Sequence, residues 1–355
     1  MPDKQHTFGQ FETPPDVADL LLGFCLRRPT DRLLDPSCGH GAFLVRAAQW
    51  LDWLTDGRGD IPAEALWGIE LDAETAVSAQ SFLPQAHIRH QNFFATTLAG
   101  ERPFDVIIGN PPYTRAEWLG KLHQEAGEQL ALFARAAPTD ATPDKKLLMP
   151  ASLWQSLGGR SGLHTYFLLH SSEFLREGGR LGFVTPNAWL DVAYGERFKQ
   201  FLLDHFKILA IIESDVERWF SEAKINTCLI VLEKCSDSQQ RANNAVRLVR
   251  LKRPLATFMP YPLSDYRRQQ AVERLVTRLL PAMSRVTDET AIKVMIQSGL
   301  QPAAKWGRLL RTSDIEVAAA PTLRPLEEWA TVQRGFTTGV NQFFYLTPNH
   351  CQMGP

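Results

Sequence analysis

The sequence predicts an α/β fold with a doubly wound, mostly parallel sheet of seven strands, followed by a basic C-terminal extension. Short apolar runs rich in β-branched residues alternate with helix-capable stretches, which is typical of a parallel sheet covered on both faces. A glycine turn follows the first run, as in nucleotide-binding folds. No helix separates the last two runs, which indicates an antiparallel strand pair at one edge.

The composition is that of an ordinary globular protein, with 355 residues, 44% hydrophobic and 22% charged. No apolar run approaches the ~20 residues that a membrane span requires. Residues 1–10 carry no signal peptide, and the five cysteines form no Cys-x-x-Cys pair. We therefore expect a cytoplasmic protein with reduced thiols, no membrane contact and no metal site.

The first predicted helix covers residues 17–26. Thr13 fits an N-cap, Pro14 fits the first helical position, and Asp16 fits the acidic position of a capping box. Capping alone explains this pattern. The alternative is functional, because a helix N-terminus also attracts a carboxylate group.

Residues 32–44 predict a strand, a glycine turn and a helix. Gly39 and Gly41 would let the backbone approach a ligand closely. The NAD fingerprint requires a third small residue where Leu44 stands, which argues against NAD.

Two more strands follow, at residues 66–71 and 87–94. Glu70 lies near the end of the first, where nucleotide folds place an acid that accepts hydrogen bonds from ribose hydroxyls. The second is expected to end with Asn92 and Phe93.

The fourth strand, residues 104–108, ends at Asn110-Pro111-Pro112-Tyr113. The prolines cannot continue a sheet ladder, so the loop is stiff and lies where open α/β sheets bind ligands. An exocyclic ring amine such as adenine N6 is a poor nucleophile, because its lone pair is delocalised. The amide oxygen of Asn110 and the carbonyl of Pro111 can accept its hydrogens, while Tyr113 can stack on the base. The alternative is a turn that only ends the strand.

The remaining elements complete the predicted sheet. A helix from Gly162 to Glu177 contains Phe167 and should stop at Gly178-Gly179. Phe220 and Lys224 lie in a polar loop between the last two strands, where the phenyl ring is suited to base stacking or to a hydrophobic plug. The other expected elements are strands at 180–186, 208–212 and 227–232 and a helix at 195–206.

Positive charge is concentrated late in the chain, although the formal net charge is −1. Residues 241–311 contain 14 Lys or Arg and four Asp or Glu. Such a block beside an acidic domain is expected of phosphate contacts, and Arg250, Arg267 and Arg268 are candidates. The alternative is a solvated helical surface.

From about residue 10 to residue 234, with a weaker similarity at 335–346, these motifs resemble the gamma class of DNA adenine-N6 methyltransferases from restriction–modification systems. The resemblance implies a class I, Rossmann-like fold that transfers a methyl group from S-adenosylmethionine to an adenine flipped out of duplex DNA. Catalysis falls to Asn110, Pro111, Pro112 and Tyr113. The base contacts are Tyr113, Phe220 and Lys224.

The resemblance also implies a set of cofactor-binding residues. The family usually has Asp where Asn92 stands, so a charged contact to the cofactor's adenine is absent here. The implied cofactor residues are Thr13, Asp35, Pro36, Ser37, Cys38, Gly39, Gly41, Glu70, Leu71, Asn92, Phe93 and Phe167.

Three regions are expected on this basis. Residues 1–235 form the catalytic domain, 236–330 a basic extension or linker that contacts the DNA backbone, and 331–355 the start of an incomplete target-recognition domain. A specificity subunit or another partner would then supply target recognition. Two alternatives stay open, a methyltransferase of a protein glutamine or ribosomal RNA base and a non-catalytic DNA-binding subunit.

Overall fold

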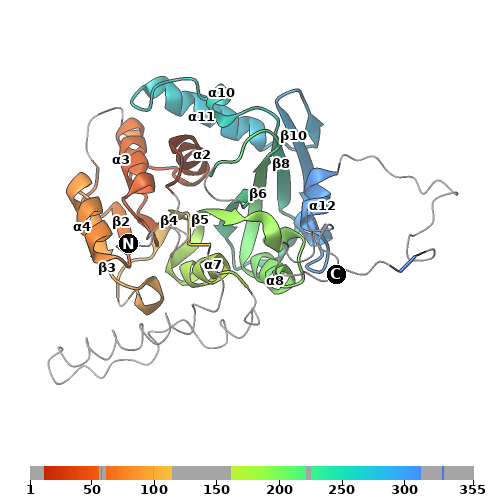
Figure 1. Cartoon of the computed structure of the whole chain (residues 1–355), viewed down its shortest axis with the longest axis horizontal. Helices are drawn as coiled ribbons and strands as arrows, with labels where there is room; N and C mark the ends of the chain where they lie inside the picture. Colours follow the sequence, from red (N-terminus) through yellow and green to blue (C-terminus); the bar gives the residue numbers. More distant parts are fainter. Residues whose placement is uncertain are drawn as a thin grey trace, which may run out of the picture. The chain divides into compact units, whose positions relative to one another are not determined.

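A ten-stranded sheet with helices on both faces organises the part of the chain that the computed structural model describes (Figure 1). The described residues are 12–55, 57, 61–98, 100–113, 161–220, 225–312 and 330–331. The chain divides into two units, residues 1–311 and 312–355, and the sheet belongs to the first. Within the described residues, none of the helices has the length and hydrophobicity needed to cross a membrane.

Hydrogen bonding places the strands in the order β3-β2-β1-β4-β5-β7-β6-β8-β10-β9. Strands β3, β2, β1, β4 and β5 are parallel, and β7 is antiparallel between β5 and β6. In chain order, the strands are β1 (Leu33–Asp35), β2 (Leu66–Glu70), β3 (His87–His90), β4 (Phe104–Gly109), β5 (Leu175–Pro186), β6 (Phe206–Ser214), β7 (Thr227–Lys234), β8 (Ala245–Leu251), β9 (Arg285–Val286) and β10 (Thr290–Ile296).

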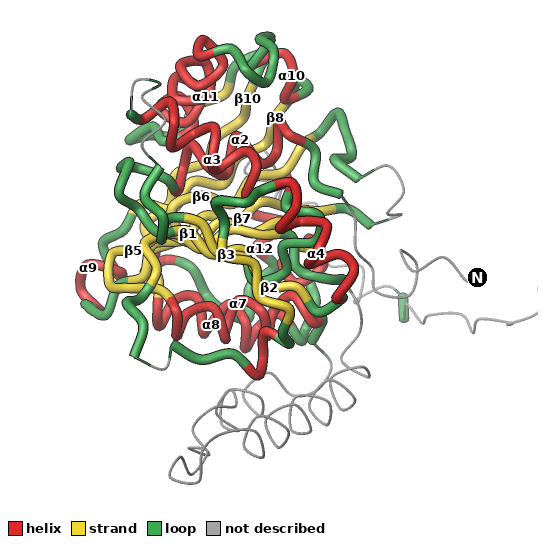
Figure 2. The backbone as a smooth tube through the Cα atoms, turned by 90° about the vertical axis from the view of Figure 1, so that its left-hand side faces the viewer, coloured by secondary structure: helices red, strands yellow, loops and turns green. Residues whose placement is uncertain are grey.

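Two helical layers cover the sheet (Figures 1 and 2). Helices α2, α3 and α11 pack on one face, and α7, α8 and α12 pack on the other, each around its own hydrophobic core. The helices and 3-10 turns are α2 (Pro15–Cys25), α3 (Ala42–Leu54), α4 (Ala73–Phe82), η1 (Phe93–Ala95), α7 (Leu163–Phe174), η4 (Asn187–Leu190), α8 (Gly195–His205), α9 (Ser238–Ala242), α10 (Leu255–Phe258), α11 (Tyr266–Leu279), η5 (Gln297–Gly299) and α12 (Trp306–Arg311).

The α/β class and the mostly parallel sheet are confirmed, but the predicted number of seven strands is too low. Strand β8 pairs in parallel with β6, and β10 and β9 continue the sheet in antiparallel fashion. The sequence analysis did not predict strand β8. Its buried apolar residues are interspersed with the partly exposed Arg247 and Arg250, so it resembles a charged linker in sequence. The domain boundary expected at residue 235 therefore falls inside the sheet.

Three predicted element boundaries are also wrong. Helix α2 begins at Pro15 with Pro14 as its N-cap, so Thr13 does not cap it and Asp16 pairs with Arg268 instead. Strand β3 stops at His90, because the Asn92 side chain accepts from the N–H of Phe94 and starts a 3-10 turn.

The third boundary is the end of α7. The helix ends at Phe174, and the Gly178-Gly179 pair lies inside β5 instead of stopping the helix. The register between β4 and β5 is irregular there, because Phe104 pairs with Leu175 whereas Val106 pairs with Arg180.

A buried ionic cluster joins the basic segment to the first helices. Asp19, which is fully buried, accepts hydrogen bonds from Arg46 at 2.7 Å, from Trp50 at 3.2 Å and from Arg268 at 2.5 Å. Arg268 lies on α11, is 3% exposed and also donates to the Met259 carbonyl. Helix α11 is therefore part of the packed unit.

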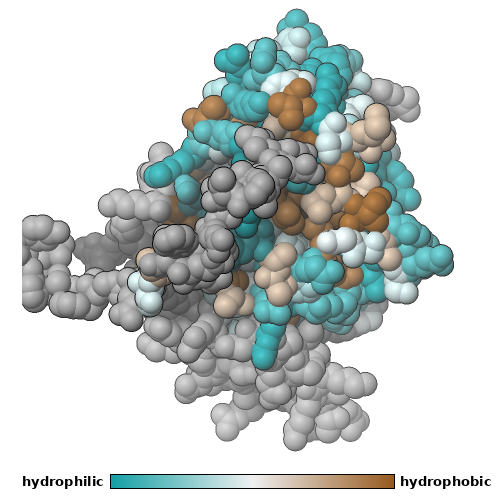
Figure 3. Space-filling model, turned by 90° about the vertical axis from the view of Figure 1, so that its right-hand side faces the viewer, coloured by the Kyte–Doolittle hydropathy of each residue, from teal (hydrophilic) through white to brown (hydrophobic). Residues whose placement is uncertain are grey.

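The last strands form one edge of the sheet, on the side that Figure 3 shows. Hydrophobic residues lie there among hydrophilic ones. Met283, Val286 and Ile296 are 78%, 73% and 53% exposed near β9 and β10. The surface at this end of the molecule therefore combines exposed hydrophobic and hydrophilic residues, although its sequence is rich in cations.

Candidate active site

The predicted site residues gather along one edge of the sheet. Strands β1, β2 and β4 are parallel neighbours, so their carboxyl ends open on the same edge. Asp35 ends β1, Glu70 ends β2, and the loop from Asn110 to Tyr113 follows β4. This edge is where open α/β sheets bind their ligands.

The glycine turn after β1 is built for close approach of the backbone. Gly39 and Gly41 have φ values of +53° and +87°, which side chains other than glycine rarely adopt. Among the described residues, no atom other than those of Gly39 and its two chain neighbours lies within 4 Å of the position that a Cβ at Gly39 would take. The turn therefore leaves space beside its own backbone.

Glu70 connects this turn to the end of β2. Its Oε2 accepts from the N–H of Gly39 at 2.9 Å, and its Oε1 accepts from the N–H of Asp72 at 2.9 Å. The Cys38 N–H also donates to the carbonyl of Ile69, and the Cys38 side chain is buried. The acid expected to bind a ribose thus also holds the glycine turn in place.

Asp35 is a buried carboxyl group, 1% exposed. Burial raises its pKa to about 8, the N–H of Ser37 acts in the opposite direction, and nearby Glu70 raises it further. Gly109 brings β4 so close that a Cβ there would lie 3.0 Å from Asp35 Oδ1. The hydroxyl of Ser37 is buried without a hydrogen-bond partner among the described residues, so this turn holds an unused donor.

An aromatic cluster lies beside the end of β3. Phe93 stacks on Phe167 of α7 with 5.4 Å between ring centroids, and Phe94 meets Phe167 edge-on at 4.8 Å. Both Phe93 and Phe167 are buried, and Asn92 is 3% exposed with its side-chain oxygen directed to Phe94. In this arrangement the rings pack on one another, and Asn92 has a local structural role.

The loop after β4 has an internal hydrogen bond. The hydroxyl of Tyr113 donates to Oδ1 of Asn110 at 2.5 Å. Burial raises the pKa of Tyr113 well above its ordinary value, so the hydroxyl stays protonated and remains a donor. The acceptor that the sequence assigned to an incoming amine thus already receives a hydrogen bond.

Phe220 lies against this loop. Its ring and that of Tyr113 are 6.3 Å apart and nearly perpendicular, at 88°. Phe220 and its neighbour Trp219 are 4% and 8% exposed and pack into the core under α2 and α3. The sequence predicts these two rings on opposite sides of a flipped adenine, and in the structure they contact each other edge-on. Lys224 lies outside the described residues.

Thr13 and Leu71 are the two remaining members of the predicted set. Thr13 is 6% exposed just before α2, and Leu71 is partly buried directly after Glu70. The carbonyl of Leu71 lies 3.1 Å from Nε2 of His90. Among the described residues, we find no cluster of His, Cys, Asp and Glu that could hold a metal ion.

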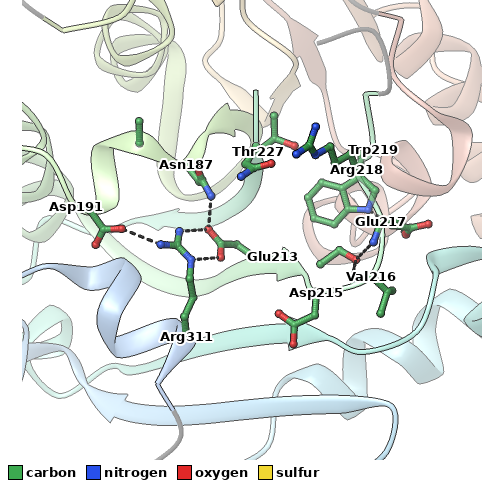
Figure 4. A pocket seen from close by; sticks show the side chains of 13 residues that line it. Asn187, Asp191, Glu213, Asp215, Val216, Glu217, Arg218, Trp219, Thr227 and Arg311 are labelled. Atoms are coloured by element: carbon green, nitrogen blue, oxygen red, sulfur yellow. Dashed lines mark hydrogen bonds and ion pairs between the residues drawn. The ribbon is translucent and has the colours of Figure 1, made fainter. Parts of the chain in front are cut away.

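A cleft of about 620 Å³ continues along the same edge (Figure 4). It lies at the ends of β5 and β6 and at the start of β7, and Trp219 forms part of its wall. Asn187 and Arg311 both donate hydrogen bonds to the Glu213 carboxylate in it. Sequence reasoning missed these residues, although Glu213 is an acid near a strand end, the signal that had pointed to Glu70.

The fold is that of methyltransferase subunits from restriction–modification systems. A family model described as N-6 DNA Methylase matches residues 2–259, and the chain belongs to this family.

The comparison with curated proteins finds restriction–modification methyltransferases. The type II methyltransferase M.BanIII of Aneurinibacillus aneurinilyticus is 26% identical over 257 residues, which cover 65% of this chain and 39% of that protein. M.TthHB8I of Thermus thermophilus is 29% identical over 188 residues, which cover 52% of this chain and 36% of that protein. The chain thus spans about two fifths of the length of these relatives.

Solved structures share the fold. The type IIG restriction endonuclease BpuSI matches with a TM-score of 0.55 and 16% identity, over 85% of this chain and 33% of that chain. The methyltransferase subunit of a type I restriction–modification system from Streptococcus thermophilus matches with a TM-score of 0.53 and 17% identity, over 81% and 56% of the two chains.

Proposed function

We propose that this chain is a site-specific DNA methyltransferase that transfers a methyl group from S-adenosylmethionine to N6 of adenine. It would act in the cytoplasm on duplex DNA, within a restriction–modification or related defence system. The observation that carries the proposal is the loop from Asn110 to Tyr113, which shares one sheet edge with the glycine turn and Glu70. The gamma class remains our assignment within the family.

The residues at the ends of β1 and β2 fit the cofactor. S-adenosylmethionine supplies a methyl group attached to a positively charged sulfonium. The space beside Gly39 and the unpartnered hydroxyl of Ser37 suit a polar ligand, and the Glu70 carboxylate retains lone pairs for ribose hydroxyls. Phe93 and Phe167 would flank its adenine. The other proposed contacts are Thr13, Asp35, Pro36, Cys38, Gly41, Leu71 and Asn92.

The loop after β4 would then act on the target amine. The adenine must leave the duplex, because its amine is unreachable inside the base stack. Asn110 Oδ1 and the carbonyl of Pro111 would accept the two amine hydrogens and expose the lone pair, with Pro112 keeping the loop stiff. Positioning of this kind can supply ~7–11 kcal/mol of the barrier reduction.

Entry of the base requires a local rearrangement. The edge contact between Tyr113 and Phe220 leaves no parallel slot for a base, since their rings are perpendicular. The Tyr113 hydroxyl must also leave Asn110 Oδ1. We propose that the flipped adenine displaces this hydroxyl and lies between the two rings, with Lys224 beside it.

Target recognition is assigned to residues 331–355, which we propose to belong to a recognition domain, together with a specificity subunit or another partner. DNA-backbone contacts remain our proposal for the segment 236–330. At least eight of its cations donate to protein groups, so those contacts fall to exposed residues such as Arg253, Arg274 and Arg285.

A methyl-transfer assay tests the proposal. The full chain is incubated with methyl-labelled S-adenosylmethionine and either unmethylated bacterial DNA, ribosomal RNA or a cellular protein extract. We expect label in DNA as N6-methyladenine, and we expect Asn110→Ala to lose transfer while calorimetry shows unchanged cofactor affinity.

The other outcomes identify the alternatives. Label in RNA or in protein glutamine would replace the DNA proposal. Cofactor binding without transfer to any substrate, together with DNA binding, would identify a non-catalytic subunit. Activity retained by Asn110→Ala would show that the loop is only structural.

A further inference from the structure

The loop that carries Phe220 is held at both ends by residues outside the predicted site. It leaves β6 after Ser214 and enters β7 at Thr227, and its described parts are 215–220 and 225–226. Because Phe220 contacts Tyr113, the position of this loop determines one wall of the proposed base site. Residues that hold the two ends of the loop therefore influence the shape of the proposed base site.

Arg311 holds the end of β6. It donates from Nε to Oε2 of Glu213 at 2.9 Å and from Nη2 to Oε1 at 2.7 Å, a two-point contact (Figure 4). Its Nη1 donates to Asp191 Oδ2 at 2.8 Å. Glu213 is only 6% exposed, so Arg311 is the cation that compensates this buried carboxylate.

Asn187 carries the connection to the other end of the loop. Its side-chain amide donates to Glu213 Oε1 at 2.9 Å, and its backbone N–H donates to the carbonyl of Asn226 at 3.0 Å. Asn226 is the last residue before β7. One guanidinium thus connects, through Glu213 and Asn187, to the residues on both sides of the loop.

The helix that presents Arg311 is itself firmly packed. Trp306 of α12 is fully buried and meets Trp189 edge-on at 6.1 Å, and Lys199 donates to the carbonyl of Ala304 at 2.7 Å. The hydrogen bonds that Arg311 donates to Glu213 raise the pKa of Arg311, so the guanidinium stays charged. Arg311 is therefore a fixed cation at the cleft.

A separate set of contacts holds the first half of the loop. Glu217 Oε1 accepts from the N–H of Leu255 at 2.9 Å and from the indole of Trp219 at 3.2 Å. Arg250 pairs with Asp215 at 3.4 Å. Loss of Arg311 should therefore loosen the strand ends and the Asn226 side first, without unfolding the whole loop.

We propose that Arg311 is a positioning residue for the proposed adenine methylation, acting through Glu213 and Asn187 on the loop that carries Phe220. The expected effect on methyl transfer rests on the proposed function, whereas the contacts of Arg311 with the loop ends do not. Arg311 lies beyond residues 2–259, the part of the chain that matches the family model. On this proposal, part of the basic segment helps to form the base site.

Hydrogen–deuterium exchange on the full chain tests the geometry without DNA. In Arg311→Ala, amides at the end of β6 and the start of β7 should exchange ~10-fold faster, while the glycine turn after β1 keeps its rate. Glu213→Gln should give the same pattern, and the double variant should be no worse than Arg311→Ala, because both changes break the same Arg311–Glu213 contact. Arg311→Lys should be intermediate, since an ammonium cannot make the two-point contact.

Lys305→Ala is the matched control, because it removes an exposed cation just before the same helix. Its exchange should equal that of the parent. In the methyl-transfer assay, Arg311→Ala should lower kcat by ~10-fold with unchanged cofactor affinity, as expected when a positioned group is lost.

Unchanged amide exchange rates around β6 and β7 in Arg311→Ala would overturn the inference. An equal rise in the exchange rate at the glycine turn would also overturn it, because it would indicate a general loss of stability. If the parent transfers no methyl group, the proposed function fails while the exchange result still decides the positioning role.

Discussion

Tyr113 and Asn110 form the smallest unit on which the proposed chemistry depends. The hydroxyl of Tyr113 donates to the amide oxygen that the target amine would use. The same residue therefore provides a stacking surface and occupies the acceptor. The two roles separate chemically, because one belongs to the ring and the other to the hydroxyl.

Tyr113→Phe keeps the ring and removes the hydroxyl. A single neutral hydrogen bond contributes ~0.5–1.5 kcal/mol, so the apparent KM for DNA should fall by ~2- to 10-fold with kcat near that of the parent. Steady-state methyl transfer measures both constants. A higher KM in Tyr113→Phe would show that the hydroxyl contacts DNA directly.

Asp35 leads to a pH prediction. Burial raises its pKa from 3.8 to about 8, so the folded chain favours the protonated carboxyl. The stability that protonated Asp35 provides is complete below its unfolded pKa and is lost as pH rises towards 8. Without added cofactor, the parent should lose stability relative to Asp35→Asn between about pH 4 and 8.

Melting temperatures of the two proteins at several pH values provide the measurement. The difference between them should widen across this range and become constant above it. A difference that does not change with pH would mean that Asp35 is already ionised in the folded chain.

At the scale of the element, α11 shows how an apparently surface-exposed basic helix can be structural. Arg267 and Arg268 are adjacent in sequence, but only Arg268 faces α2. Arg268 is 3% exposed and pairs with Asp16 and Asp19, whereas the Arg267 side chain is 66% exposed and pairs with Asp265 on its own loop. The expectation that both contact DNA is therefore wrong for Arg268.

This difference gives a matched pair of variants. Arg268→Ala removes one of the two guanidinium partners of the fully buried Asp19 and should destabilise the chain by up to about 3–5 kcal/mol. Arg267→Ala should change stability little, because an exposed pair is screened by water. Urea unfolding of both variants measures the difference, and equal effects would contradict the assignment of Arg268 to the core.

At the scale of the whole molecule, the sheet and the basic segment form one unit. Strand β8 pairs with β6, α11 packs on α2, and α12 reaches the cleft through Arg311. Many cations in this unit bind protein groups, and some of these, such as Arg267, are also exposed. Exposed cations outside that set are the better candidates for phosphate contacts.

Arg253, Arg274 and Arg285 are exposed and are our candidates for DNA-backbone contact. Each phosphate neutralised contributes a slope near −0.9 to the dependence of log affinity on log salt. Changing all three to Glu should weaken DNA binding on any sequence and reduce the slope by up to ~2.7, with cofactor affinity unchanged. Fluorescence anisotropy at several salt concentrations measures this, and an unchanged slope would place the contacts elsewhere.

The sequence by itself determined the fold class and the location of the candidate site. Buried parallel strands appear as continuous apolar runs, and glycine and proline mark the turns at which these strands end. The glycine turn, Glu70 and the loop from Asn110 to Tyr113 were all identified in this way. Their gathering at one edge follows from parallel pairing.

Only the tertiary structure decided which polar residues pair with one another. Strand β8 was missed because its alternating arginines resemble a linker, and Arg268 was misassigned because nothing local distinguishes it from Arg267. Arg311 and Glu213 are 98 positions apart in the sequence, so no local pattern indicates that they pair. Local patterns report backbone preference and burial, whereas the partner of a charge depends on which distant segments the fold brings into contact.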